Sequence, residues 1–571
     1  MKSDNLWRIK FLFIFLVLLT VLFGWRLFFL QMIKGEEYAE RVDRQYLRSA
    51  RTFFNRGSIF FSDKNGNLVP AATLRQEFIL TINPRQINNP EKVLELLETT
   101  IEILDREDFI RRANRQESAY EEIAHSLEEE MAEKISQMNI RGVYLLKEKK
   151  RFYPGGSLGS HVIGFMAYQD KDFAGRYGLE KHYQDVLSRQ ETGSFNSFFA
   201  EVFLNKEISE EVGSDKQGDV ILTIEPTIQA QLENRLNDLV EKYSAEGAGG
   251  VVMDPRTGAI IAMASNPDFN PGGKVNDISV LPNPLVERVF EMGSIIKPLT
   301  LAAGFNENVI RPETTYYDAG EVILNNRRIM NHDKKARGTV DMQTVIDQSL
   351  NTGAIYVMRL IGMEKFRDYM LNRYGLGEKT GIDLPDEIKS LTSNLLSNRE
   401  VECATASFGQ GIALTPIAAI RAFAVLANGG YLINPHVVKA IRTNEGSIKE
   451  TTPYLGKKVL DVKATDEITI MLIKAVDEVL LGGSLKLPHH TIAGKTGTAQ
   501  MPSRVGRGYD PDRYLHSYFG YYPAYEPRFI TLFYLINPQG VRFASDSIAP
   551  VFMDFAQFVI NYYELPPDRK N

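Results

Sequence analysis

The chain has 571 residues, more than one hydrophobic core usually supports, so we expect two or more domains. Hydrophobic residues make up 44% and charged residues 24%, which are near globular averages and exclude collagen-like, disordered and multi-span membrane proteins. The 66 basic and 72 acidic residues give a net charge of −6, which argues against a nucleic-acid partner. The single cysteine, Cys403, excludes an intramolecular disulfide, and neither it nor the scattered histidines form a metal-binding motif.

The first predicted element is a membrane anchor near the N-terminus. Residues 11–25 carry no charge, and a second apolar run follows Arg26 up to Ile33. The 23 residues from 11 to 33 would form about 34 Å of helix, enough to cross a hydrocarbon layer of ~30 Å. A cleaved signal peptide is the alternative, but no small-residue cleavage site follows the run. Basic residues precede the span and acidic residues follow it, so we expect residues 1–10 to stay in the cytoplasm and the remainder to lie outside.

Two regions of different composition follow the span. Residues 34–215 are rich in charge, and apolar residues recur at helical spacing between 91 and 137, which predicts amphipathic helices in a spacer or pedestal domain. Residues 216–571 contain apolar runs typical of strands and buried helices. Among them, two such runs on either side of a Pro-Arg-Thr-Gly turn predict a β-hairpin over 249–265.

The second region also ends in strands. We expect residues 514–522 to pair with 529–536, and a helix over 415–428 that ends before a Gly-Gly pair. Strands at both ends with helices between them predict an α+β domain whose sheet is completed by distant parts of the chain. The stretch 502–513, rich in Gly, Pro, Arg and Asp, is either a mobile lip of a cleft or a solvated hairpin loop.

The first pattern that carries chemistry is Ser294-Ile-Ile-Lys297-Pro298. If Ser294 opens a helix, Lys297 lies on the same face and its amine can take the proton of the hydroxyl. Pro298 suits a first helical turn, and the free N–H groups at a helix start favour a developing oxyanion. A serine and a lysine at this spacing also arise by chance, so an ordinary helix cap is the alternative.

Two further patterns lie downstream. Ser349-Leu-Asn351 falls in an apolar segment, where a bend would let both polar side chains project, although a satisfied polar turn is the alternative. Lys495-Thr496-Gly497-Thr498 follows residues typical of a strand, and its glycine would let another backbone approach closely. Such a strand could bind a substrate peptide through main-chain hydrogen bonds.

Two similar patterns are interpreted as structural. Lys379-Thr-Gly381 repeats three letters of the downstream pattern but runs into Ile-Asp-Leu-Pro, which predicts a loop. Gly155-Gly-Ser157-Leu-Gly159 matches the nucleophile elbow of hydrolases, but Pro154 stands where the preceding strand would have to run. We therefore do not expect Ser157 to be a nucleophile.

The order of the three chemical patterns is more informative than any one of them. Ser-x-x-Lys is followed after 55 residues by Ser-x-Asn, and after a further 146 by Lys-Thr-Gly-Thr. This ordered set is typical of penicillin-binding proteins and class A β-lactamases.

With these motifs, the chain resembles the class B penicillin-binding proteins, which are membrane-anchored peptidoglycan D,D-transpeptidases, over nearly its whole length. Further landmarks of the resemblance are Arg56-Gly-Ser-Ile59, Asp63-Lys-Asn-Gly66, His161-Val-Ile-Gly164, Tyr177-Gly-Leu-Glu180 and Phe408-Gly-Gln-Gly411. The Ser-x-Asn form of the second motif and the Ser-Phe-Gly-Gln-Gly run look more like the septal, cell-division branch than the elongation branch. The insertion Phe60-Phe61-Ser62 departs from the family pattern and puts the local hairpin in doubt.

The resemblance implies a fold and a reaction. It implies an antiparallel sheet flanked by helices, preceded by an elongated α+β pedestal, and acyl transfer in two steps without a cofactor. Ser294 would attack a D-Ala-D-Ala stem peptide, with Lys297 as its base. Lys297 must be uncharged for this, and Lys495 would supply the neighbouring cation that lowers its pKa.

The remaining motif residues have supporting roles under this hypothesis. Ser349 would relay a proton to the leaving amine, while Asn351 would bind the substrate amide and fix the catalytic lysine. Thr496, Gly497 and Thr498 would bind substrate, and the backbone N–H groups of Thr498 and the catalytic serine would form the oxyanion hole.

Several functional alternatives stay open at this point. The same motifs serve a D,D-carboxypeptidase or a β-lactamase, which use water as acceptor, and a non-catalytic β-lactam sensor or scaffold. The resemblance further implies β-lactams as covalent inhibitors, a multi-span glycan polymerase and division proteins as partners, and a bacterial cytoplasmic membrane location with a single pass and an outer catalytic domain.

Overall fold

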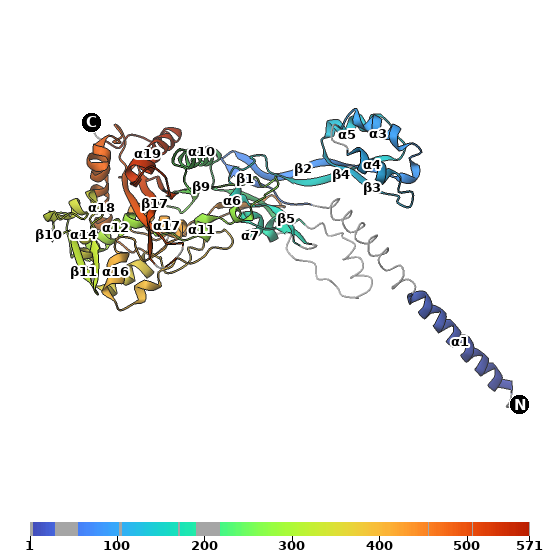
Figure 1. Ribbon diagram of the computed structural model, residues 1–571, viewed down its shortest axis with the longest axis horizontal. Coiled ribbons are helices and arrows are strands. Elements are labelled where there is room, and N and C mark those ends of the chain that lie inside the picture. Colours follow the sequence, from blue (N-terminus) through green and yellow to red (C-terminus); the bar gives the residue numbers. More distant parts are fainter. Residues whose placement is uncertain are drawn as a thin grey trace. The chain divides into compact units, whose positions relative to one another are not determined.

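The computed structural model describes residues 4–28, 55–101, 105–169, 172–189, 217–454, 456–504, 506 and 508–569. They fall into two compact units, which Figure 1 shows coloured along the chain. Of the described residues, the first unit holds those up to Arg56 and those within Leu74–Lys150, and the second holds those within Gly57–Thr73, those within Arg151–Arg189 and those from residue 217 onward. The predicted boundary between residues 215 and 216 lies outside the described residues.

Two segments expected in the pedestal region 34–215 cluster with the second unit instead, Gly57–Thr73 and Arg151–Arg189. The reason is strand pairing: β1 (Ile59–Ser62) runs parallel to β7 (Gly218–Leu222), and β7 pairs antiparallel with a strand from much later in the chain. Such long-range partners leave no mark in local composition, which is what the predicted regions were based on.

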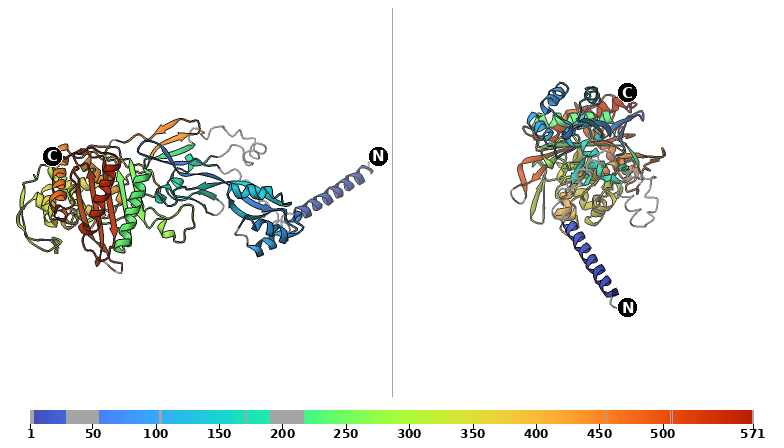
Figure 2. Two further views of the ribbon diagram at one scale, coloured as in Figure 1. Left: turned by 90° about the horizontal axis from the view of Figure 1, so that it is seen from above. Right: turned by 90° about the vertical axis from the view of Figure 1, so that its right-hand side faces the viewer.

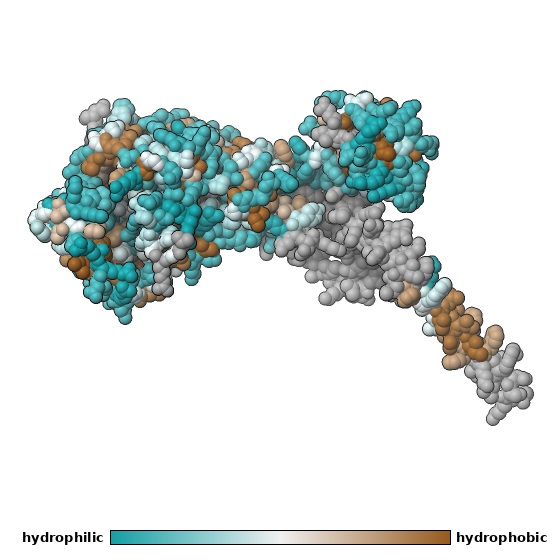
Figure 3. All heavy atoms as spheres, in the orientation of Figure 1, coloured by the Kyte–Doolittle hydropathy of each residue, from teal (hydrophilic) through white to brown (hydrophobic). Residues whose placement is uncertain are grey.

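The N-terminal helix α1 (Asp4–Phe28) exposes apolar side chains between Phe11 and Trp25, and Figure 3 shows them in brown. Among the residues described, none of the helices meets the combined length and hydropathy that a membrane crossing requires. The span expected over 11–33 also extends into residues 29–33, which lie outside the described part of the chain. The membrane anchor therefore stays a prediction.

The first unit is a small α+β arrangement with its own core. Its further elements are β2 (Leu68–Ile82, which begins in the second unit), the 3₁₀ turn η2 (Pro84–Gln86), α3 (Pro90–Glu98), α4 (Arg106–Ala113), β3 (Glu121–Leu127), α5 (Glu129–Gln137) and β4 (Val143–Phe152, which ends in the second unit). The predicted helices between 91 and 137 are confirmed except over β3. That segment pairs antiparallel with β2, and Leu127 and Leu80 join the common core, so tertiary pairing overrides the local helical spacing.

The second unit contains the remaining elements. Before the main sheet they are α6 (Ser160–Ile163), β5 (Met166–Gln169), β6 (Asp172–Gly175), α7 (Gly178–His182), α8 (Gln184–Leu187) and α10 (Pro226–Tyr243). In the middle they are α11 (Pro284–Glu287), α12 (Lys297–Asn306), β10 (Thr315–Asp318), β11 (Glu321–Leu324), β12 (Arg327–Met330), β13 (Gly338–Asp341), α13 (Met342–Asp347), α14 (Asn351–Ile361), α15 (Met363–Asp368), α16 (Glu400–Ala406), α17 (Pro416–Ala427), β14 (Val438–Thr443), β15 (Ile448–Glu450) and α18 (Val462–Lys474). Single-turn 3₁₀ and π segments are η4 (Ile278–Val280), η5 (Gly293–Ile296), η6 (Tyr369–Arg373), η7 (Ser393–Leu396), η8 (Ala475–Val479) and η9 (Leu480–Gly483).

A five-stranded antiparallel sheet organises this unit, in the order β16-β17-β18-β8-β9. Its strands are β8 (Gly247–Met253), β9 (Ile260–Asn266), β16 (Ala493–Pro502), β17 (Tyr509–Tyr522) and β18 (Phe529–Ile536). The first and last parts of the region therefore complete one sheet, which confirms the predicted α+β class. Helices α10 and α19 (Ala544–Tyr562) cover one face, and α12, α17 and α18 lie on the other. The left view of Figure 2 looks onto the face that α10, in green, covers.

The hairpin from β16 to β17 differs from the prediction. Strand β17 begins at Tyr509 rather than at 514, so much of the stretch 502–513 is strand. The Tyr509 hydroxyl donates to the Glu291 carboxylate at 2.9 Å, and Arg513 donates to Glu246 at 2.7 Å. The solvated hairpin is thus the better of the two interpretations for the described residues of this stretch. In the order of the strands, β16 is the edge strand of the sheet.

Candidate active site

Ser294 and Lys297 lie on one face of a helix start. Ser294 is in the 3₁₀ turn η5, and α12 begins at Lys297 with Pro298 in its first turn, where a missing N–H is harmless. Lys297 Nζ lies 3.0 Å from Ser294 Oγ. The predicted i, i+3 pairing of the hydroxyl and the amine is confirmed.

The amine of Lys297 is fully buried, with none of the residue exposed. It also contacts Ser349, whose carbonyl oxygen lies at 2.5 Å and whose hydroxyl lies at 3.0 Å. Burial, and then the charge of Lys495, place its pKa well below the usual lysine value. An uncharged amine has two N–H donors and one lone pair, so it can donate twice to Ser349 and accept the proton of Ser294.

The second motif lies in the turn between α13 and α14. Ser349 has a φ of 53°, the left-handed region that a serine adopts only when its surroundings hold it there. Asn351 begins α14, and its Nδ2 donates to the carbonyl of Met330 at 2.9 Å. We expected Asn351 to fix Lys297, but Ser349 makes that contact through its own carbonyl and hydroxyl.

Lys495 lies on the edge strand β16 and is also buried, at 6% exposed. Its amine donates to Ser349 Oγ at 3.2 Å and to the Thr496 carbonyl at 3.1 Å. Burial lowers its pKa to about 8, while the Asp347 carboxylate opposes that effect. The pKa of Lys297 is the more strongly lowered of the two, so Lys297 gives up its proton more readily than Lys495, which suits the two amines to different chemical roles.

Gly497 is required by a close approach of two backbones. A Cβ there would lie 2.7 Å from the carbonyl oxygen of Met292 and 2.4 Å from Ser517 Oγ. The glycine therefore lets β16 pack directly against the turn that carries Ser294, whereas the close approach of a substrate backbone that the sequence predicts at Gly497 stays a prediction. The Thr498 hydroxyl accepts from Ala544 N at 3.1 Å, which ties the strand to the start of α19.

The three motifs line one open cleft of about 780 Å³. Ser294, Ser349, Asn351, Lys495, Thr496 and Thr498 all contribute to it. The cleft is also lined by residues that the sequence analysis did not single out, among them Asn331, His332, Arg337, Gln500, Tyr514, Arg542 and Phe543. They come from the loop between β12 and β13, from the hairpin β16–β17 and from the approach to α19, so only the assembled fold reveals them.

The two patterns interpreted as structural lie outside this cleft. Thr380 is buried, and both its N–H and its hydroxyl donate to Glu387 Oε1 at 2.7 Å. Lys379-Thr-Gly381 is therefore a loop that hydrogen bonds to a carboxylate hold in place. Ser157 precedes the short helix α6 and does not line the cleft. Among the residues that the structure describes, no group of His, Cys, Asp or Glu is arranged to hold a metal ion.

Comparison with protein families gives two matches along the chain. The family described as penicillin binding protein transpeptidase domain matches residues 248–557, and the family described as penicillin-binding protein dimerisation domain matches residues 54–197. The first covers more than half of the chain and contains all three motifs.

Individual relatives are similar over most of their length. The chain is 29% identical to stage V sporulation protein D of Bacillus subtilis over 557 residues, covering 95% of this chain and 84% of the relative. It is 26% identical to peptidoglycan D,D-transpeptidase FtsI of Escherichia coli K12, covering 97% and 91%. In fold, it is similar to penicillin binding protein 3 of Mycobacterium tuberculosis in complex with aztreonam, with a TM-score of 0.68, 22% identity and coverage of 90% and 98%. Penicillin binding protein 2X of Streptococcus thermophilus gives a TM-score of 0.74 at 20% identity, with coverage of 90% and 81%.

Proposed function

We propose, from the premise that this chain belongs to the class B penicillin-binding proteins, that it cross-links peptidoglycan stem peptides as a serine D,D-transpeptidase. The observation that carries the proposal is the contact of 3.0 Å between Ser294 Oγ and Lys297 Nζ, made by an amine whose pKa burial has lowered. An alcohol beside an uncharged buried amine is an activated nucleophile.

In the first half-reaction Ser294 attacks the carbonyl of the terminal D-Ala-D-Ala bond. Lys297 takes the hydroxyl proton, and Ser349, which lies within 3.0 Å of that amine, passes a proton to the leaving D-alanine. Lys495 stays charged and binds the terminal carboxylate together with Thr496 and Thr498. The backbone N–H groups of Thr498 and Ser294 stabilise the oxyanion.

In the second half-reaction an amine of a neighbouring stem peptide attacks the acyl-enzyme. The attacking nitrogen loses a proton, which returns through Ser349 to the Lys297–Ser294 pair, and the acyl group leaves the serine oxygen. The open cleft of about 780 Å³ leaves room for a second peptide chain along edge strand β16.

Hydrolysis is the principal alternative, because water in place of the amine would make the chain a carboxypeptidase or a β-lactamase. The match to a separate N-terminal module over residues 54–197 favours cross-linking, since a small secreted lactamase needs no such module. A purely sensing or scaffolding role is disfavoured by the intact contacts among Ser294, Lys297, Ser349 and Lys495.

We further propose that the chain is anchored in the cytoplasmic membrane by residues 11–33, with the catalytic unit outside and residues 1–10 inside. The uncharged run 11–25 and the basic residues before it support this. A septal role, with a multi-span glycan polymerase and division proteins as partners, is supported by the Ser-x-Asn motif and by the FtsI relatives. The similarity to stage V sporulation protein D makes sporulation one alternative process, and wall elongation is the other.

The test is a product assay on the full-length chain in detergent, with a D-Ala-D-Ala stem peptide as donor and a second stem peptide as amine acceptor. The proposal predicts release of D-alanine together with a cross-linked dimer, loss of both in Ser294→Ala, and no loss in the control Ser157→Ala. Release of D-alanine with only the hydrolysed peptide as product would identify a carboxypeptidase.

A further inference from the structure

The second motif is held from outside by a segment to which the mechanism assigns no role. Helix α14 begins at Asn351, and its N-cap residue Leu350 provides no side-chain cap for the free N–H groups of the first turn. Asn331 supplies the missing acceptor, since its Oδ1 accepts from Asn351 N at 2.9 Å and from Thr352 N at 3.3 Å. A residue twenty positions upstream thus caps the helix that carries the motif.

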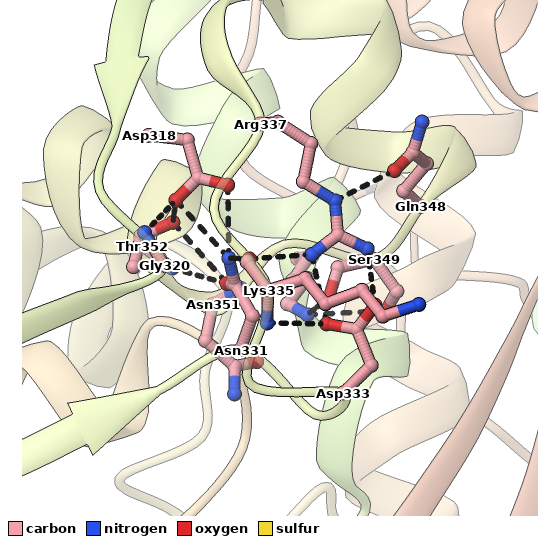
Figure 4. A network of polar contacts seen from close by, with 11 residues as sticks. Asp318, Gly320, Asn331, Asp333, Lys335, Arg337, Gln348, Ser349, Asn351 and Thr352 are labelled. Carbon is pink, nitrogen blue, oxygen red and sulfur yellow. Dashed lines mark hydrogen bonds and ion pairs between the residues drawn. The ribbon is translucent and has the colours of Figure 1, made fainter.

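Asp318 fixes the orientation of that cap. Asn331 Nδ2 donates to both carboxylate oxygens of Asp318, at 3.1 and 3.0 Å, so the amide oxygen must face α14 (Figure 4). The Thr352 hydroxyl donates to Asp318 Oδ1 at 2.8 Å, which closes the ring of contacts. Asp318 is 0%, Asn331 2% and Thr352 3% exposed, so water does not compete for these bonds.

The side chain of Asn351 is held by the neighbouring residue of the same segment. Its Nδ2 donates to the carbonyl of Met330, the residue before Asn331. Backbone and side chain of Asn351 are therefore fixed by two consecutive residues. Because its amide nitrogen is engaged, its amide oxygen is the atom that can accept from a substrate N–H.

A second contact holds the other side of the motif. Arg337 Nε donates to Gln348 Oε1 at 2.9 Å, immediately before Ser349. Asp333 orients that arginine through two bonds of 2.8 and 2.6 Å, and the guanidinium lowers the pKa of Asp333 to about 2 (Figure 4). The left-handed Ser349 therefore lies between two anchored residues, Gln348 and Asn351.

We infer that Asp318 and Asn331 are positioning residues of the transpeptidase reaction. They hold α14 so that Ser349 keeps its contacts with both catalytic lysines and Asn351 presents its amide oxygen to substrate. This inference rests on the proposed function. A fully buried carboxylate is costly to bury unless a network of hydrogen bonds uses it, and the network here ends on the motif.

The test compares Asp318→Asn with the matched control Glu387→Gln in the full-length chain. Glu387 is also a buried carboxylate, with bonds from Thr380 N, Thr380 Oγ1 and Gly381 N, but it stabilises a loop outside the cleft. The readouts are the second-order rate of acylation by a fluorescent penicillin as a function of pH, and the melting temperature.

Asp318→Asn should slow acylation on the order of 10²-fold, because a small displacement of catalytic groups has that effect. The pH at which the acylation rate of this variant begins to rise should move upward. A loosened motif admits water beside Lys297, and water raises the pKa of that amine. Glu387→Gln should leave the rate within about twofold of wild type at a comparable loss of melting temperature.

The double variant Asp318→Asn/Asn331→Asp exchanges donor and acceptor within the pair and restores the cap. It should be acylated at least about tenfold faster than Asn331→Asp alone. This comparison tests the inference even if Asp318→Asn does not fold. The inference would be overturned if Asp318→Asn were acylated at the wild-type rate, or if Glu387→Gln lost as much of the acylation rate as Asp318→Asn. It would also be overturned if the double variant were acylated no faster than Asn331→Asp. A wild-type chain that penicillin does not acylate would overturn the proposed function itself.

Discussion

Lys297 and Lys495 both reach the hydroxyl oxygen of Ser349, at 3.0 and 3.2 Å. Two buried amines this close cannot both carry a proton without a large energetic cost. The fully buried Lys297 has the more strongly lowered pKa, whereas that of Lys495 falls to about 8. One shared hydroxyl thus links an amine whose pKa lies well below the usual lysine value to an amine whose pKa is about 8, and the first two predictions below follow from that difference.

Removal of the base should nearly abolish acylation. Lys297→Ala leaves the Ser294 hydroxyl without a proton acceptor, and we expect its rate of acylation by penicillin to fall on the order of 10³-fold or more. Stopped-flow or gel-based labelling measures this rate. Lys379→Ala, in the structural Lys-Thr-Gly loop, is the control and should react as wild type. A loss below about tenfold in Lys297→Ala would assign the proton to another group.

The acylation rate should depend on pH with two limbs. Lys297 acts only when deprotonated, so the rate rises with pH through its lowered pKa. Lys495 acts as a cation, so the rate falls again as pH rises through about 8. Lys495→Arg should abolish the alkaline limb, because a guanidinium keeps its charge over this range, even though its geometry reduces the rate. An alkaline limb that persists near pH 8 in Lys495→Arg would show that another group produces it.

Gly409 should be sensitive to the addition of a single methyl group. Its φ is 81°, and a Cβ would lie 2.1 Å from the carbonyl oxygen of Gly293, the residue before the nucleophile. We expect Gly409→Ala to lower the free energy of unfolding by about 1–3 kcal/mol and acylation by about tenfold or more. Thermal denaturation and labelling kinetics measure the two effects.

Gly381→Ala is the matched control for that substitution. Gly381 has a φ of 76°, but a Cβ there meets nothing within 4 Å. It should therefore lose only the stability that backbone strain costs, about 1 kcal/mol, and acylate normally. Equal losses of acylation in both variants would mean that backbone strain, and not the contact with Gly293, causes the effect.

Much of the catalytic unit follows from local sequence. The i, i+3 spacing of Ser294 and Lys297, with Pro298 behind them, sets their shared face, and the strand β18 is found at the predicted residues 529–536. Helix α17 differs from its prediction by one residue at each end. These features depend on periodicity, caps and turns, which act over a few residues.

What the sequence did not reveal depends on partners far along the chain. Segment Glu121–Leu127 is a strand because β2 pairs with it, despite its helical spacing. The cap of α14 comes from Asn331, and the acid that orients it comes from Asp318. Neither residue matches a motif, and ordinary polar residues in loops reveal such roles only once the fold brings them to a helix end.

The most direct test is to locate the acyl group. Wild-type full-length chain is treated with a penicillin, digested, and examined by mass spectrometry for a peptide that has gained the mass of the drug. The account predicts one adduct, on the peptide that contains Ser294 and at that residue, and none in Ser294→Ala. An adduct on any other serine, or labelling of Ser294→Ala at the wild-type rate, would contradict it.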